Sequence, residues 1–175
     1  NIKIIGDKSL SKRDFYRVIK PLKKFGAKFR YKKKGLPLII TGTDNPKSIK
    51  YFESKGSAQC KSCVMLASLN APGETIIKAK KSRNHSELFF KTLNIPIKIK
   101  QNKSFDLIKL KCVKRIKPIN YKIPSDISSS SFFIVLTALT KNSKLLIKNV
   151  NVNPSRIGII TILKRMGVNI ILKNK

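Results

Sequence analysis

Apolar residues in the first part of the chain follow the period of an amphipathic helix. They recur every three or four positions between residues 12 and 25, at Phe15, Val18, Ile19 and Leu22. Lysines at 20, 23 and 24 occupy positions between them, as expected for a solvent-facing side. The run stops at Gly26, and a short apolar stretch follows. We predict a helix over Lys12–Phe25 with one buried face, followed by a strand.

The same ending recurs twice further along the chain. The segments 22–29, 90–97 and 163–170 each end an amphipathic run with Gly26, Asn94 or Gly167 and then turn into an apolar stretch. Gly and Asn readily adopt the left-handed conformation just after a helix. The three positions are 68 and 73 residues apart, and an apolar helix and strand at 60–69 and 75–78 recur 70 residues later. One supersecondary unit of about 70 residues therefore repeats.

The middle copy of this unit reads strand, helix, strand, helix, strand, strand. Its predicted bounds are Ser48–Phe52, Ala58–Leu69, Glu74–Ala79, Arg83–Leu93, Ile95–Lys100 and Phe105–Lys111. The last copy has a helix at Phe132–Leu139 and strands at Leu145–Lys148 and Ile170–Lys173. The helix from Ser57 to Leu69 is apolar on most sides, so we expect it to lie inside, packed against strands. The pattern predicts an α/β fold with a basic hinge at 114–120.

Three of the predicted helices begin with hydroxyl-bearing residues. Ser57 and Gln59 follow a glycine, Ser82 and Arg83 precede the next helix, and residues 126–131 read Asp-Ile-Ser-Ser-Ser-Ser. Free N–H groups and the macrodipole favour an anion at a helix start. Ser82 to Glu87 also fits an ordinary capping arrangement, and Asp126 is expected to be a cap. The repeated pattern, together with Arg83, indicates a phosphate or carboxylate ligand.

The net charge of +31 raises a second possibility, a basic nucleic-acid-binding protein. Lysine accounts for 32 of the 39 basic residues, and these lysines are spread along the whole chain. Recognition of single-stranded nucleic acid would also use aromatic platforms, but the chain has no Trp and four scattered Tyr. We interpret the lysines as solvated surface and expect no nucleic-acid partner.

The three cysteines do not form a disulfide framework. Cys60 and Cys63 match C-x-x-C, but Cys112 and the single His85 do not supply a second ligand pair, so we expect a structural role and no metal. The longest apolar run is too short to span a bilayer. The sequence predicts a cytoplasmic protein without a membrane segment. The first residue is Asn1, and a strand pattern begins at once, which indicates an internal part of a longer protein.

An ordered set of short motifs resembles one enzyme family. The motifs include Gly6-Asp7-Lys8-Ser9-Leu10 with Arg13, Ser57-Ala58-Gln59-x-Lys61-Ser62, Leu69-x-Ala71-x-Gly73-x-Thr75, Ser82-Arg83-Asn84-His85-Ser86-Glu87, Pro124-Ser125-Asp126 and Asn153-Pro154-x-Arg156. Each motif alone is weak. Together, in this order and over nearly the whole chain, they resemble the 5-enolpyruvylshikimate-3-phosphate synthases.

The resemblance implies a fold and a reaction. The fold is an inside-out α/β barrel of repeated βαβαββ units in two globular halves, here incomplete. Residues 1–123 would belong to the first half and residues 124–175 would start the second. The reaction transfers the enolpyruvyl group of phosphoenolpyruvate to the 5-hydroxyl of shikimate 3-phosphate and releases phosphate, within aromatic amino-acid biosynthesis. The resemblance further implies a full-length monomer that needs no metal or organic cofactor.

The resemblance also assigns individual residues. Ser57, Ala58 and Gln59 match the segment that holds the phosphate of shikimate 3-phosphate, and Ser82 and Arg83 match the pair that completes this site. Arg13 matches the arginine that grips phosphoenolpyruvate, and Gln59 lies between the two substrates. His85 is expected to support the same region, whereas no role is assigned to Arg156.

Some positions depart from the family pattern, including Asp14 where the family usually has Pro, Ser125 for Gly and Asn84 for Asp. The family's catalytic Asp, Glu and Lys and its Asn-x-Gly-Thr loop have no match in this sequence. We therefore expect no catalytic residue within the chain, weak substrate binding by the chain alone, and no turnover. A related transferase acting on uridine-diphosphate N-acetylglucosamine shares the fold and the enolpyruvyl donor, but Ser57–Gln59 and Ser82–His85 favour the shikimate phosphate pocket.

Overall fold

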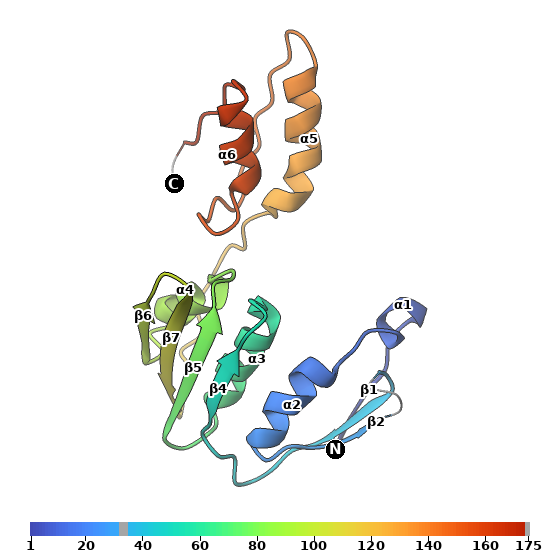
Figure 1. Cartoon of the computed structure of the whole chain (residues 1–175), viewed down its shortest axis with the longest axis vertical. Helices are drawn as coiled ribbons and strands as arrows, with labels where there is room; N and C mark the ends of the chain where they lie inside the picture. Colours follow the sequence, from blue (N-terminus) through green and yellow to red (C-terminus); the bar gives the residue numbers. More distant parts are fainter. Residues whose placement is uncertain (32–34, 174–175) are drawn as a thin grey trace. The chain divides into compact units, whose positions relative to one another are not determined.

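A computed structural model describes residues 1–31 and 35–173, which divide into two compact units, Asn1–Pro118 and Ile119–Lys175 (Figure 1). The division falls inside the basic segment 114–120 that was expected to be a hinge. It lies five residues before the boundary expected after residue 123. That these units belong to two halves of a longer enzyme stays a prediction.

The first part of unit 1 is a small antiparallel sheet with helices. Its strands, in the order β1-β3-β2, are β1 (Ile2–Ile4), β3 (Leu38–Thr41) and β2 (Lys28–Tyr31). The helix predicted over Lys12–Phe25 is α2 (Tyr16–Lys24), which starts four residues later, and a short helix not predicted, α1 (Lys8–Ser11), precedes it. The late start of α2 has a local cause, because the Asp14 carboxylate accepts the Tyr16 N–H at 2.7 Å and holds a turn there. The predicted apolar face is confirmed, with Ile19 fully buried.

The middle copy of the repeat folds as the pattern predicts. Its elements are β4 (Lys50–Glu53), α3 (Ala58–Ser68), β5 (Glu74–Lys80), α4 (His85–Thr92), β6 (Ile97–Gln101) and β7 (Phe105–Lys111). The sheet order is β4-β5-β7-β6 (Figure 1). β4 and β5 run parallel and are joined through α3, while β7 pairs antiparallel with both β5 and β6. The parallel pair places the starts of α3 and α4 at the same edge of the sheet, since each helix follows one of its strands.

The core of unit 1 lies between this sheet and its helices. Alternate residues of β5 and β7 are buried together with Val64 and Met65 of α3, as the period of a strand requires. α3 is interior on that side, as expected. Leu66, one of its apolar residues, is 57% exposed, so the expectation that α3 lies inside is wrong for this face. The sheet packs against α3, and α2 also packs against it. Neither the sheet nor α2 covers Leu66.

The repeated helix endings are confirmed. Gly26, Asn94 and Gly167 have φ angles of +108°, +54° and +89°, which lie in the left-handed region. Each residue follows an amphipathic helix, α2, α4 or α6 (Gly158–Arg165). Most side chains cost energy in this conformation, so Gly or Asn is favoured there. These residues therefore locate the ends of the helices in this sequence.

Unit 2 contains α5 (Ile127–Leu139) and α6, and it corrects two predictions. Neither Leu145–Lys148 nor Ile170–Lys173 forms a strand. In the described residues the nearest sheet pairing is a single parallel bridge between Ser125 and Val150. The matching strand of unit 1, β5, has a partner strand on each side. An apolar run forms a strand only where a neighbouring strand pairs with its backbone N–H and C=O groups. Within unit 2, the described residues supply only the one bridge between Ser125 and Val150.

Candidate functional site

The start of α3 is held by a buried carboxylate at the end of β4. Glu53 accepts the N–H groups of Lys55 and Ser57 at 3.0 and 2.9 Å. Between them Gly56 has a φ of +69°, and a Cβ at this position would lie 3.1 Å from the Lys81 carbonyl oxygen. Glycine therefore allows the loop to turn close to the end of β5. The loop fixes where α3 begins.

Ser57 caps α3 with its side chain. Its hydroxyl oxygen accepts the Cys60 N–H at 3.2 Å, and its backbone is extended, as an N-cap requires. A hydroxyl that accepts one hydrogen bond still has a proton to donate. The first N–H groups of a helix, here at Ala58 and Gln59, have no partner within the helix. The α3 start thus presents several donors to an anion.

The segment before α4 lies directly against the start of α3. The ammonium of Lys61, in the first turn of α3, donates to the Arg83 carbonyl oxygen at 2.9 Å. The same ammonium lies 2.5 Å from a carboxylate oxygen of Glu87. The hydroxyl groups of Ser62 and Ser86 are 2.5 Å apart. The two predicted phosphate-binding segments, 57–59 and 82–83, are therefore neighbours in unit 1.

Ser82 is half-buried, but its hydroxyl oxygen is fully buried and makes no hydrogen bond in the part of the chain that the structure describes. The N-cap of α4 is Asn84, so the alternative in which Ser82 only caps this helix is not what the structure shows. A buried hydroxyl without a partner costs about 1 to 3 kcal/mol. The Ser82 hydroxyl is therefore a candidate donor to a ligand, close in sequence to the Arg83 carbonyl that Lys61 of α3 bonds.

Two predicted residues sit at the edge of this cluster. Gln59 is exposed, and its amide oxygen accepts a hydrogen bond from the guanidinium of Arg17 in α2 at 2.6 Å. Arg13 is exposed between α1 and α2, four residues before Arg17. The structure brings Ser57, Ala58, Gln59, Ser82 and Arg83 together, and it connects α2 to them through Arg17. Within residues 1–31 and 35–173, no hydrogen bond or ion pair joins the Arg13 side chain to the cluster.

The start of α5 in unit 2 has different chemistry. Its cap is the Asp126 carboxylate, which accepts the Ser129 N–H at 3.2 Å, as predicted for a cap residue. The Arg156 guanidinium lies 3.3 Å from the same carboxylate and also donates to the Ser128 hydroxyl. Hydrogen bonds from the Ser128 and Ser129 backbones, followed by Arg156, lower the pKa of Asp126 below 3.8. This helix start already holds its own anion.

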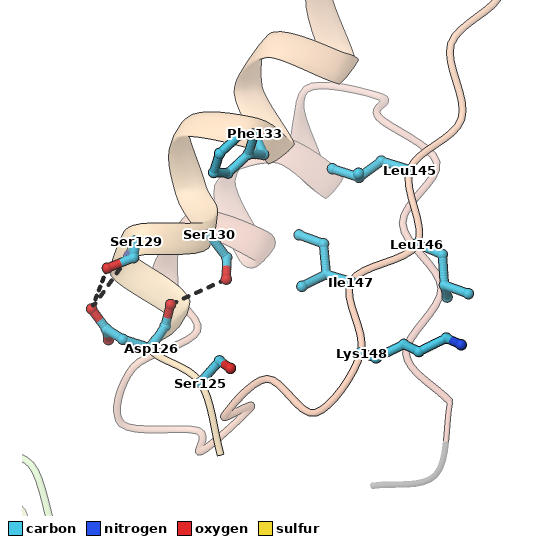
Figure 2. Close-up of a pocket in the computed structure, with 9 residues that line it drawn as sticks. All are labelled: Ser125, Asp126, Ser129, Ser130, Phe133, Leu145, Leu146, Ile147 and Lys148. Carbon is cyan, nitrogen blue, oxygen red and sulfur yellow. Dashed lines mark hydrogen bonds between the residues drawn. The ribbon is translucent and has the colours of Figure 1, made fainter. Parts of the chain in front are cut away.

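A hollow of about 380 Å³ lies beside the α5 start, between the helix and the segment 145–148 (Figure 2). Figure 2 shows apolar side chains along most of it, with the Ser130 hydroxyl bonded to the Asp126 carbonyl at 3.1 Å rather than offered to the hollow. Its residues are Ser125, Asp126, Ser129, Ser130, Phe133, Leu145, Leu146, Ile147 and Lys148. Asp126, Ser129 and Ser130 are hydrogen-bonded to one another at this hollow, unlike Ser82.

The cysteines are free thiols in the folded chain. Cys60 is buried, and burial, with a smaller effect of Cys60, raises the pKa of Cys63 to about 11. A thiol with this pKa is protonated near neutral pH and is a poor nucleophile. Among the residues described, no group of three or more His, Cys, Asp or Glu side chains is placed to bind a metal ion. None of the helices formed by the described residues has the length and apolar character of a membrane span.

Comparison with solved structures gives the class of protein. The chain is similar to a solved structure of EPSP synthase from Acinetobacter baumannii, with a TM-score of 0.79 and 38% sequence identity. The match covers 94% of this chain and 37% of that chain. The fold is thus the inside-out α/β barrel of repeated βαβαββ units, in incomplete form, as the sequence predicted.

Comparison of sequences gives the family. The model for EPSP synthase (3-phosphoshikimate 1-carboxyvinyltransferase) matches residues 1–175. Curated relatives named 3-phosphoshikimate 1-carboxyvinyltransferase include those of Petrotoga mobilis, 42% identical over 175 residues, and Endomicrobium trichonymphae, 41% identical over 172 residues. Each match covers 98% of this chain and 40% or 39% of the relative. This chain belongs to the EPSP synthase family, an enzyme family, and it spans about 40% of the length of these relatives.

Sequence reasoning predicted the two segments that the structure places side by side, 57–59 and 82–83, but missed the side chains that connect them. Arg17 was not singled out, although it follows Arg13 by one helical turn. Lys61 is 1% exposed, so the interpretation of the lysines as solvated is wrong at this position. Its place in the motif Ser57-Ala58-Gln59-x-Lys61 was the available signal, because the motif kept one lysine inside an otherwise apolar helix.

Proposed function

We propose that this chain carries the shikimate 3-phosphate site of a 3-phosphoshikimate 1-carboxyvinyltransferase. The reaction transfers the enolpyruvyl group of phosphoenolpyruvate to the 5-hydroxyl oxygen of shikimate 3-phosphate. The hydroxyl loses its proton, and the phosphate of phosphoenolpyruvate leaves. The enzyme would act in the cytoplasm as a monomer, in the biosynthesis of aromatic amino acids, with no cofactor and no nucleic-acid partner.

The observation that carries this proposal is the buried Ser82 hydroxyl, which has no hydrogen-bond partner among the described residues and lies next to Arg83. In the proposed complex Ser82 and Ser57 donate to phosphate oxygens. The N–H groups at Ala58 and Gln59 add the positive end of α3. The Arg83 guanidinium supplies a fork of charged donors that suits a phosphate. A phosphate would satisfy donors that the protein itself leaves open.

Phosphoenolpyruvate would lie on the Gln59 side of this pocket. The Arg17–Gln59 hydrogen bond supports this position, because it holds α2 and its preceding segment against the start of α3. Arg13 would bind the donor's charged groups, and Gln59 would lie between the two substrates. The role of this chain is thus to bind and orient. Proton transfer needs an acid and a base of tuned pKa, and we propose that none of the eight acidic residues of this chain serves in that role.

The test is the binding of shikimate 3-phosphate by the chain, measured by calorimetry. We expect binding of shikimate 3-phosphate, no measurable binding of shikimate at the same concentrations, and competition by inorganic phosphate. Arg83→Ala should weaken binding by about ten- to hundredfold, since it removes charge-assisted hydrogen bonds. Arg115→Ala is the matched control, because Arg115 is equally basic and exposed but lies in the hinge.

Four outcomes would contradict the proposal. Equal losses with both arginine variants would mean that net charge, not the site, attracts the ligand. Preferential binding of uridine-diphosphate N-acetylglucosamine would point to the related transferase, and salt-sensitive binding of RNA without any response to shikimate 3-phosphate would point to a nucleic-acid-binding protein. Release of phosphate by the chain alone, given both substrates, would overturn the assignment of a binding role only.

A further inference from the structure

The buried ion pair between α3 and α4 has no part in the function proposed above. Lys61 is the largest fully buried side chain of the described residues, 1% exposed, and Glu87 is 3% exposed. One carboxylate oxygen of Glu87 contacts the Lys61 ammonium, and the other is buried with no hydrogen-bond partner in the described part of the chain. Two charges removed from water with one oxygen left unpaired are a poor source of stability. The pair therefore calls for a different explanation.

The second hydrogen bond of Lys61 supplies one. Its ammonium donates to the Arg83 carbonyl oxygen at 2.9 Å, next in the chain to Ser82. This bond ties the backbone at 82–83 to the first turn of α3, where Ser57 caps the helix. Arg83 is exposed and precedes the first residue of α4 by two positions, so helical hydrogen bonds do not hold it. Glu87 is the counter-ion of this ammonium and fixes its direction.

We propose that Lys61 is a positioning residue for the phosphate pocket, with Glu87 as its counter-ion. Lys61 holds the Ser82–Arg83 backbone at a fixed distance from the α3 start, so that the two groups of donors converge on one phosphate. This inference rests on the proposed function for its ligand. The placement of the backbone can be measured without any ligand.

Two variants separate positioning from stability. Lys61→Met with Glu87→Leu removes both charges and should fold with nearly unchanged resistance to urea, because apolar groups of similar volume replace the pair. Its affinity for shikimate 3-phosphate should fall by about tenfold or more, since the 82–83 backbone is released. Glu87→Gln should do the opposite. It leaves a buried ammonium without a counter-ion and lowers stability, but it keeps the bond to Arg83 and most of the affinity.

A structural role alone predicts that affinity follows stability in both variants, and that result would overturn the proposal. Ser62→Ala is the matched control. It removes a 2.5 Å contact with Ser86 between the same two segments but leaves the Arg83 carbonyl bonded, so affinity should change by no more than about twofold. Should the Met/Leu variant not fold, Lys61→Met with Glu87→Gln takes its place under the same criterion.

The ligand-free readout is the amide resonances of Ser82 and Arg83 in a ¹H–¹⁵N NMR spectrum. They should shift or broaden in the Lys61→Met, Glu87→Leu variant while resonances of β5 and β7 stay in place. Unchanged resonances at 82 and 83 in the folded variant would overturn the proposal, whatever the ligand. If the parent chain fails to bind shikimate 3-phosphate but these resonances move, the proposed function fails and the positioning of this segment by Lys61 stands.

Discussion

The starts of α3 and α5 look alike in sequence and differ in chemistry. Both contain serine, and they are 69 residues apart in the repeat. α3 is capped by the neutral Ser57, with the partnerless Ser82 hydroxyl close by, whereas α5 is capped by the charged Asp126, which is paired with Arg156. The positive end of a helix can stabilise an internal carboxylate or an external anion. The charge of the cap residue decides which of the two is bound.

The largest expected effect comes from giving α3 the cap of α5. Ser57→Asp should keep the helix, because Asp is as good an N-cap as Ser, but should weaken shikimate 3-phosphate binding by about a hundredfold through charge repulsion. Calorimetry measures the affinity, and circular dichroism checks the fold. The reciprocal variant, Asp126→Ser, should leave the affinity unchanged. If Ser57→Asp binds as well as the parent chain, the α3 start is not the phosphate site.

A smaller effect is expected from removing the partnerless hydroxyl. Ser82→Ala should cost about tenfold in shikimate 3-phosphate affinity, yet leave the ligand-free chain equally or more stable, because an unsatisfied buried group is removed. Urea unfolding with and without ligand measures both quantities. Ser128→Ala in unit 2 is the control, since its hydroxyl is bonded to Arg156 and should not affect binding. A loss of stability in ligand-free Ser82→Ala would show that Ser82 has a partner in the protein after all.

The comparison also shows what a sequence can predict here. The middle copy and the left-handed helix ends were predictable, because they depend on local periodicity and on residues that tolerate a positive φ. The absence of a strand at Leu145–Lys148 was not predictable, since a strand depends on a partner strand that an apolar run does not reveal. The α2 start was missed because one Asp14 side chain holds a turn where the helical period continues.

The site divides in the same way. Ser57, Ser82 and Arg83 could be picked out because helix starts with hydroxyl groups are visible in the sequence. Lys61 was missed, because the 32 lysines were interpreted together as solvated surface and the place of Lys61 in the motif Ser57-Ala58-Gln59-x-Lys61 was not used. Its burial depends on Glu87, 26 residues later, and on the sheet edge that brings the two helices together. Contacts between residues far apart in the sequence, such as Lys61 and Glu87, are the part of the site that local sequence patterns do not reveal.

The smallest expected effect is the pH dependence of the α5 cap. The pKa of Asp126 is lowered in the folded chain, so the carboxylate binds its proton less readily when folded than when unfolded. Its contribution to stability is therefore complete above its ordinary pKa of 3.8 and is lost as the pH falls through the lower folded value.

A carbon-detected NMR titration of Asp126 should give a midpoint below 3.8, and Arg156→Ala should raise that midpoint toward 3.8. The Ser57 cap has no such transition, because a hydroxyl does not titrate in this range. A midpoint at or above 3.8 would mean that the α5 start does not stabilise the Asp126 carboxylate. The two helix starts would then not differ in whether they already bind an internal anion.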